Sequence, residues 1–267
     1  MTDQPNMPTN DGPNTDKPLT GQTALVTGAA LRTGRCIALS LAQSGADLVI
    51  HYNQNETAAQ ELATEIKSLG VQATCMSADF SDPGAAQALG ERVIEQIGKL
   101  DIIVNNVGVY PVSGTLELSL EQFQHTLCAN LTSPYALIRS CLPLLLKSQN
   151  ANIINIGYAG TELLAANSYA STYQITKTAL LLLTKNLAQE FGKSGIRANM
   201  VSPGQLDNSV DLPDNIEQII PLERPGMPQE IADTILFLLT KGTYISGINI
   251  DVAGGYKLGL ARKYQDQ

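Results

Sequence analysis

A tyrosine and a lysine four residues apart form the most reactive pair in this chain. Tyr173 and Lys177 stand in "YQITK", at the start of a long apolar stretch with helical character. Residues at positions i and i+4 of a helix share one face, one turn apart. A phenol with a pKa of about 10 exchanges protons poorly at neutral pH unless a nearby cation favours the phenolate. The pair therefore predicts a tyrosine that works in proton transfer with help from Lys177.

A glycine-containing turn is the second candidate feature. The stretch "TGAALRTGRCIA", residues 27–38, follows the apolar run "ALVT" and leads into a helical pattern. Backbone N–H groups at a helix start, together with the positive end of the helix dipole, can hold a pyrophosphate without a charged side chain. Arg32 stands where a middle glycine would be expected. We expect a dinucleotide to be contacted by Thr27, Gly28, Arg32, Thr33 and Gly34.

Short apolar runs alternate with helix-periodic stretches along the chain. We expect strands at "TALVTG", "ADLVIHY", "VQATCMSAD", "LDIIVNN", "ANIINIG", "IRANMVSPG" and "GINIDVAGG". The helices between them should cover about residues 34–44, 56–69, 83–98, 119–147, 169–192 and 228–240. Near-continuous apolar strands are typical of a parallel sheet buried on both faces. The sequence thus predicts an α/β, Rossmann-type, doubly wound parallel sheet, with ligands beyond the carboxyl ends of its strands.

The first 20 residues differ in composition from the rest of the chain. They are rich in Pro, Asn, Asp and Thr and almost lack large apolar side chains, so we expect residues 1–20 to form a disordered N-terminal tail. Residues 21–267 should form one domain that contains both the cofactor site and the substrate site. A length of 267 residues, of which 43% are hydrophobic, is sufficient for one full core.

Charge and cysteine content exclude several classes of partner. The net charge of -8 argues against nucleic-acid binding and against a basic membrane-binding face. The four cysteines and two histidines form no metal-ligand pattern. No apolar stretch approaches the roughly 20 residues of a membrane helix, and no signal segment opens the chain. We expect a cytoplasmic protein without a bound metal, acting on a small molecule.

Over about residues 21–258, the chain resembles the short-chain dehydrogenase/reductase family. The turn matches three of the four marked positions of the family pattern TGxxxGxG, "NNVG" matches NNAG, and "YQITK" matches YxxxK. The arginine in the turn is similar to that of the pteridine reductase branch. The overall pattern is also close to 3-oxoacyl-carrier-protein reductases.

The resemblance implies roles for further residues. The family holds the nicotinamide ribose with the lysine of YxxxK, and a helix asparagine, here Asn130, holds a relay water through its backbone carbonyl. Asp79 in "SADF" resembles the acid that accepts a bond from adenine. The resemblance also implies cofactor contacts at Phe80, Asn105, Val107, Gly108, Pro203 and Gly204. Members are usually homotetramers or dimers, and apolar faces at 131–146 and 178–187 are compatible with such assembly.

The end of the second predicted strand indicates the cofactor. An enzyme that selects NAD usually carries an acid there, which binds the ribose hydroxyls and repels a 2′-phosphate. Here the strand ends in "IHYNQNE", where the side chains of Asn53, Gln54 and Asn55 are neutral. With Arg32 on the neighbouring turn as a reader of the 2′-phosphate, or of a substrate ring beside it, we predict NADPH in preference to NADH.

The position of the family's catalytic serine is altered. In "INIGYAGTE", Tyr158 replaces that serine, and Thr161 lies 12 residues before the catalytic tyrosine. Either hydroxyl is a candidate to polarise the substrate, and Tyr158 is also a candidate structural ring of the pocket wall. The leading interpretation is an NADPH-dependent reductase of a ketone or 3-oxoacyl substrate. A pteridine reductase and a non-catalytic regulatory protein that binds the cofactor are the alternatives.

Overall fold

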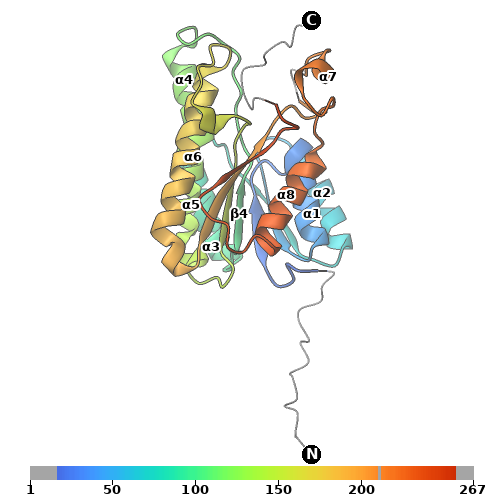
Figure 1. The fold of residues 1–267 in the computed structure, drawn as a ribbon. Helices are drawn as coiled ribbons and strands as arrows, with labels where there is room; N and C mark the ends of the chain where they lie inside the picture. The colour runs from blue at the N-terminus through green and yellow to red at the C-terminus, as the bar shows by residue number, and fades with distance from the viewer. Residues whose placement is uncertain (1–16, 210–211, 257–267) are drawn as a thin grey trace, which may run out of the picture.

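A parallel β-sheet forms the centre of the protein, and helices cover both of its faces (Figure 1). The computed structural model describes residues 17–209 and 212–256. In this part of the chain, seven strands pair in the order β3-β2-β1-β4-β5-β6-β7, all of them parallel. The order changes direction between β1 and β4, which is the switch point where ligands bind in such sheets. The predicted doubly wound Rossmann-type fold is confirmed.

The strands and helices alternate along the chain. The strands are β1 (Thr23–Val26), β2 (Asp47–Tyr52), β3 (Ala73–Ser77), β4 (Ile102–Asn105), β5 (Asn152–Ile156), β6 (Arg197–Pro203) and β7 (Asn249–Val252). The α-helices are α1 (Arg32–Gln43), α2 (Glu56–Ser68), α3 (Pro83–Gln96), α4 (Leu120–Leu127), α5 (Ser133–Leu145), α6 (Ser171–Phe191), α7 (Ile216–Ile219) and α8 (Pro228–Thr240). All seven predicted strands are therefore present, whereas the short α7 was not expected.

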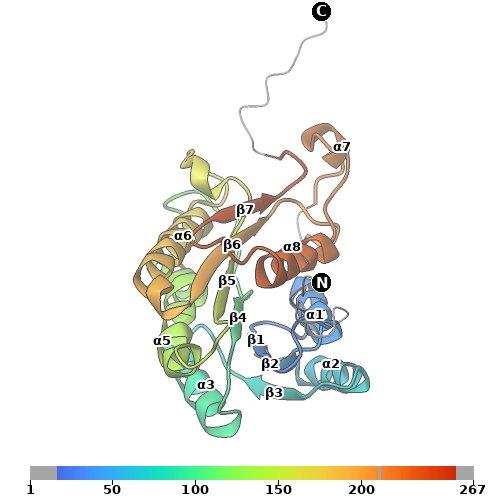
Figure 2. The same ribbon diagram turned by 60° about the horizontal axis from the view of Figure 1, so that its bottom comes forward.

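Two apolar cores lie on opposite faces of the sheet. Helices α1, α2 and α8 cover one face, and α3, α5 and α6 cover the other (Figure 2). Successive side chains of a strand point to opposite faces. Ala24 and Val26 accordingly pack in one core and Leu25 in the other, all fully buried. Because both faces are buried, the strands need no polar alternation, and this explains the continuous apolar runs.

The helix expected over 119–147 is present over residues 120–145, but it is not a regular α-helix throughout. A five-residue π-helical segment, Cys128–Thr132, separates α4 from α5. In this segment the N–H of Ser133 donates to the carbonyl of Cys128, five residues earlier. Pro134 follows at once and has no N–H to donate to the carbonyl four residues before it. Such π-segments within helices are frequent at functional sites.

The ordered domain begins before residue 21. Residues 1–16 of the expected tail lie outside the described residues, but residues 17–20 pack on the domain. Leu19 is buried, and its N–H donates to the carbonyl of Ser44 at 2.8 Å. The side chain of Lys17 donates to the carbonyl of Leu69 at 3.1 Å. The boundary expected at residue 20 was therefore placed too late, because a single buried leucine is not visible in composition.

Helix length and the grouping of side chains bear on membrane and metal binding. None of the helices in 17–209 and 212–256 has both the length and the apolar character needed to cross a membrane. Within the same ranges, no three His, Cys, Asp or Glu side chains gather in a group that could hold a metal ion.

Gly34 sets the distance between α1 and the turn that precedes it. A Cβ at this position would lie 2.2 Å from the carbonyl oxygen of Gly28 and 2.7 Å from Nδ2 of Asn106. No side chain fits at these distances without movement of the helix or of the turn. The second glycine of the motif is thus required for packing.

Gly34→Ala should lower the free energy of unfolding by about 1–3 kcal/mol, because the added methyl group overpacks the contact between helix and turn. Chemical denaturation measures the loss. Gly192→Ala is the matched control, since Gly192 has a helical φ of −58° and an added Cβ meets nothing within 4 Å. Equal stability of the two variants would contradict this account of Gly34.

Candidate active site

Helix α6 places Tyr173 and Lys177 together at the carboxyl edge of the sheet. Lys177 is 2% exposed, and its Nζ donates a hydrogen bond to the carbonyl of Ile156, the last residue of β5, at 2.7 Å. The same Nζ lies 5.6 Å from the centre of the Tyr173 ring. The structure therefore brings the pair together as the spacing predicted, with the ammonium group over one face of the phenol ring.

Burial changes the proton affinity of both groups. Removal from water lowers the pKa of Lys177 to about 8. Burial also raises the pKa of Tyr173 well above its ordinary value, and the neighbouring Tyr110 and Tyr158 raise it further. Desolvation disfavours the charged form in each case. In the protein alone, Tyr173 is consequently a neutral phenol at neutral pH and has a proton to donate.

Asn130 lies in the π-segment and is fully buried. Its Oδ1 accepts the N–H of Val109 at 2.7 Å, and its Nδ2 donates to the carbonyl of Val109 at 2.9 Å. Nδ2 also donates to Oγ1 of Thr176, the residue before the lysine, at 3.0 Å. The side chain thus ties the loop after β4 to α6. The backbone carbonyl of Asn130 cannot take the usual helical bond, because Pro134 lacks an N–H.

Gly108 keeps the space beside the lysine open. A Cβ here would lie 3.3 Å from Nζ of Lys177 and 3.7 Å from Oδ1 of Asn130. Any larger residue would come between the ammonium group and a ligand that approaches from the loop after β4. The role expected for the last residue of "NNVG" is consistent with this position.

The structure distinguishes Tyr158 from Thr161. The rings of Tyr158 and Tyr173 are 5.6 Å apart, and both line one cavity. Thr161 is fully buried, does not line that cavity, and donates its hydroxyl to the carbonyl of Tyr158 at 2.5 Å. Of the two candidate residues, the one that lies beside Tyr173 in this cavity is therefore Tyr158. Tyr110 adds a third ring, 4.8 Å from Tyr173 and perpendicular to it.

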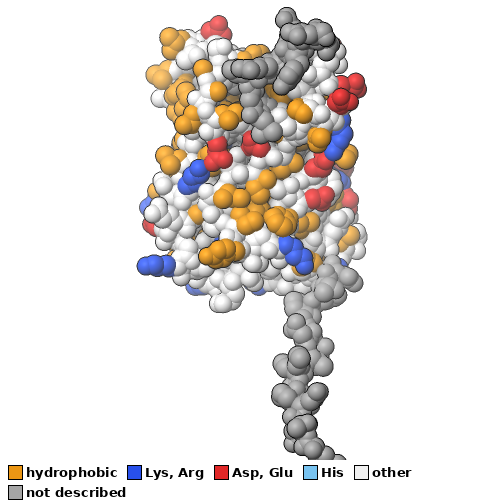
Figure 3. All heavy atoms as spheres, viewed as in Figure 1, with side chains coloured by type: hydrophobic (Ala, Val, Ile, Leu, Met, Phe, Trp, Pro, Cys, Tyr) orange, Lys and Arg blue, Asp and Glu red, His pale blue; other side chains and the backbone are white. Residues whose placement is uncertain are grey.

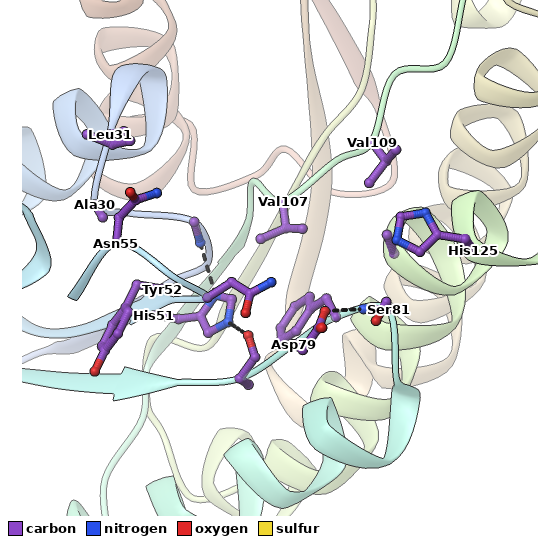
Figure 4. Close-up of a pocket in the computed structure, with 15 residues that line it drawn as sticks. Ala30, Leu31, His51, Tyr52, Asn55, Asp79, Ser81, Val107, Val109 and His125 are labelled. Carbon is purple, nitrogen blue, oxygen red and sulfur yellow. Dashed lines mark hydrogen bonds between the residues drawn. The ribbon is translucent and has the colours of Figure 1, made fainter. Parts of the chain in front are cut away.

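Two cavities lie along the carboxyl edge of the sheet. The first, of about 360 Å³, lies between the glycine turn and the ends of β2 and β3 (Figure 4). The second, of about 310 Å³, surrounds the tyrosines. Of the predicted site residues, the first cavity is lined by Gly28, Asn53, Asn55, Asp79, Phe80 and Val107. The second is lined by Arg32, Thr33, Gly108, Tyr158, Tyr173, Pro203 and Gly204.

Several predicted contacts line neither cavity, and their bonds explain why. Oγ1 of Thr27 accepts the N–H groups of Asn106 and Val107, so Thr27 joins the glycine turn to the loop after β4. Asn105 is buried and donates to Oδ1 of Asn155 at 2.8 Å. Gln54 is exposed. Gly34, Asn130 and Lys177 also line neither cavity and lie behind the residues that do.

Arg32 lies on the catalytic side of the turn. It is exposed, it has a left-handed φ of 51°, and it lines the second cavity with Tyr158 and Tyr173. It does not line the first cavity, where Asn53 and Asn55 lie. Arg32 therefore lies beside the tyrosine rings and apart from Asn53 and Asn55.

The first cavity is nearly neutral. Asp79 is its one carboxylate among the described lining residues, and Oδ1 of Asp79 accepts the N–H of Ser81 at 2.9 Å. This bond lowers the pKa of Asp79. The sequence assigned no role to His51 and His125, which line this cavity, or to Tyr110, which lines the second. The sequence could have indicated His51 and Tyr110 only by their position, because His51 lies at the carboxyl end of β2 and Tyr110 lies in the loop after β4.

Comparisons with known proteins agree with this geometry. A family profile described as enoyl-(acyl carrier protein) reductase matches residues 28–257. A 3-oxoacyl-[acyl-carrier-protein] reductase of Synechocystis sp. is 34% identical over 245 residues, which are 89% of this chain and 97% of that protein.

Two solved structures are similar over almost their whole length. A blue fluorescent protein from a metagenomic library, in complex with NADPH, has a TM-score of 0.84 and 30% identity over 90% of this chain and 99% of its own. The angucycline C-6 ketoreductase LanV with bound NADP has a TM-score of 0.83 and 32% identity over 91% and 98%.

The fold and the paired tyrosine and lysine define a Rossmann-fold oxidoreductase. Together with the family profile and the relatives of at least 30% identity, they show that the chain belongs to the short-chain dehydrogenase/reductase family. The resemblance inferred from the motifs is therefore confirmed.

Lys177→Met should change how stability depends on pH. Between the lowered pKa of about 8 and the ordinary value of 10.5, the unfolded wild-type chain binds a proton at this lysine that the folded chain does not. Wild-type stability therefore rises with pH through this window, by about 3 kcal/mol relative to Lys177→Met. Denaturation at pH 7 and pH 10.5 measures the effect. Lys185→Met, an exposed lysine of the same helix, is the control. If the free energy of unfolding depended on pH identically in wild type and Lys177→Met, the lowered pKa of the buried lysine would be refuted.

Proposed function

We propose that this protein is an NADPH-dependent reductase of a small carbonyl substrate, with Tyr173 as the proton donor. The observation that carries the proposal is the protonated phenol of Tyr173 above the buried ammonium group of Lys177, on the wall of a cavity of about 310 Å³. The first cavity, between the glycine turn and the ends of β2 and β3, lies along the same edge of the sheet. Together they suit an extended dinucleotide with its reactive end beside the tyrosine.

The residues present fit such a cofactor. The first turn of α1 leaves N–H groups free of helical bonds, as a pyrophosphate requires. Asp79, Asn53 and Asn55 line the cavity that would take the adenosine end. No acid ends β2, and the structures similar to this chain include complexes with NADPH and NADP. These observations support NADPH over NADH.

Each residue of the catalytic cavity has a defined task in this proposal. The bound cofactor supplies a hydride to the carbonyl carbon. Tyr173 donates its phenolic proton to the oxygen, and the ammonium group of Lys177 stabilises the negative charge that this leaves on the phenol. Tyr158, whose ring lies 5.6 Å from that of Tyr173, offers a second hydroxyl to polarise the same oxygen. Asn130 holds the loop at Val109 against α6 and so keeps the pair aligned.

A pteridine reductase that acts on a C=N bond is the second candidate. The position of Arg32 beside the tyrosine rings favours it, because a guanidinium group can stack on or bind a flat polar ring. Tyr158 in place of the family's serine and the neutral side chains of Asn53, Gln54 and Asn55 oppose it. Oxidation of NADPH with a panel of ketones, oxoacyl thioesters and dihydropteridines separates these reductases from each other and from a non-catalytic regulatory protein, which would bind NADPH and turn over nothing.

A homodimer or homotetramer is part of the proposal. Ile175 and Leu182 of α6 are 49% and 61% exposed, and Leu164 beside them is 73% exposed. Exposed hydrophobic side chains also gather on the face shown in Figure 3. Contiguous exposed apolar side chains mark protein interfaces in soluble proteins. Light scattering of the purified protein measures the state of assembly.

Tyr173→Phe should lower kcat by about 10²–10⁴ because it removes the transferable proton. The Kd for NADPH should stay within about threefold of wild type, since ring size and packing are retained. Tyr135→Phe, which alters an exposed tyrosine of α5 away from both cavities, is the matched control. Full turnover by Tyr173→Phe would remove this residue from the mechanism.

Arg32→Ala should raise the KM for the oxidised substrate about tenfold, the effect of one lost charged contact. Arg35→Ala is the control, because Arg35 lies in the same helix and forms an ion pair with Glu65. Comparison of the KM for NADPH with the KM for NADH tests the other role of Arg32, contact with the 2′-phosphate. A rise confined to the KM for NADPH would assign Arg32 to the 2′-phosphate instead.

A further inference from the structure

His51 connects the ends of three neighbouring strands. It lies in β2 and is 1% exposed. Its Nδ1 accepts the N–H of Gly28, after β1, at 3.0 Å, and its Nε2 bonds the carbonyl of Ala78, after β3, at 3.1 Å (Figure 4). The ring also stacks on Phe80, with centroids 4.4 Å apart and planes inclined by 23°.

These bonds define the protonation of the ring. A nitrogen that accepts an N–H carries no proton, so Nδ1 is bare and Nε2–H donates to Ala78. The ring is then neutral, with both nitrogens satisfied. Burial, with a smaller contribution from the positive charge of Arg92, lowers the pKa of His51 to about 4, which agrees with this state at neutral pH.

His51 also determines which donors of the glycine turn remain for an anion. Its backbone carbonyl accepts the N–H of Ala29 at 2.9 Å, while its ring accepts the N–H of Gly28. The first two N–H groups of the turn are therefore occupied by one residue. The N–H groups that follow, from Ala30 into the first turn of α1, are the ones that can face a pyrophosphate.

The opposite edge of the ring positions the far wall of the same cavity. Ala78 and Phe80, its two contacts there, flank Asp79 in sequence. Gly28, Asp79 and His51 all line the first cavity. A shift of the imidazole would consequently move the phosphate side and the adenosine side of the cavity relative to each other.

We infer that His51 is a positioning residue for the dinucleotide: its neutral ring sets the distance between the glycine turn and the loop that carries Asp79. The inference rests on the proposed NADPH binding and adds to it a residue that determines cofactor affinity. It assigns no contact with the reacting atoms, because His51 does not line the cavity around Tyr173.

Three substitutions separate the contacts of the ring. His51→Phe keeps an aromatic ring against Phe80 and loses both hydrogen bonds. His51→Asn places an acceptor oxygen where Nδ1 stands and loses the bond to Ala78. His51→Gln places an N–H donor at the same number of bonds as Nε2 and loses the bond to Gly28. Asn199→Leu is the control, since this buried side chain of β6 also bonds one carbonyl and one N–H, those of Ile245 and Ile248, and lines neither cavity.

We expect His51→Phe to raise the Kd for NADPH about tenfold, since it leaves the Gly28 N–H without its partner. His51→Asn should recover most of the affinity, and His51→Gln should not, because the turn depends on the acceptor. The kcat at saturating NADPH should stay within about twofold of wild type in each variant. Fluorescence titration with NADPH and steady-state kinetics on the full chain measure both quantities.

The outcomes are distinguishable. Wild-type affinity for NADPH in all three variants would overturn the positioning role. So would equal losses of affinity in His51→Asn and His51→Gln that parallel the losses of thermal stability in these variants. A wild-type protein that does not bind NADPH would overturn the proposed function, and the inference with it. If the Phe variant does not fold, ¹⁵N NMR of labelled histidine in the wild type serves: a His51 signal with Nδ1 protonated, or one unmoved by NADPH, would also refute the inference.

Discussion

Burial of the Lys177 ammonium group is the interaction on which the catalytic end of the molecule depends. A charge removed from water is costly unless it is bonded, and here the carbonyl at the end of β5 supplies the bond. The remaining cost appears as the lowered pKa of Lys177. Tyr173 above it keeps its proton for the same reason, since both groups lie in an environment that disfavours charge. A ligand that brings charge or a polar ribose to this cavity would relieve part of that cost. The free energy so recovered would contribute to ligand binding and catalysis.

Holding this charge requires an irregular backbone nearby. The π-segment at Cys128–Thr132 turns Asn130 so that its amide bonds both the loop after β4 and Thr176 of α6. A regular helix would present a different side chain at this point. The loop then places Gly108 beside Nζ, where no Cβ fits comfortably. The deviation from regular helix geometry is thus the means by which three separate segments are aligned.

The two cavities depend on each other through the glycine turn. On one side Thr27 and Asn106 tie the turn to the loop after β4, and on the other side His51 ties it to β2 and β3. Arg32 leaves the same turn toward the tyrosines. The turn is therefore held from both sides, so that the adenosine end and the reactive end of an extended ligand are positioned by one rigid element. This suits hydride transfer, in which small displacements of the reacting atoms are costly.

The sequence by itself determined the strands, most helices and the Tyr173–Lys177 pair, because apolar periodicity and an i, i+4 spacing are local properties. It could not show the π-helical segment at Cys128–Thr132, the packing of Leu19, or the orientation of Asn105 toward Asn155. Tertiary structure also decided that Tyr158 and not Thr161 shares a cavity with Tyr173, and that Arg32 lines the same cavity. These features depend on which distant segments pack together, and the linear pattern of residue types does not contain that information.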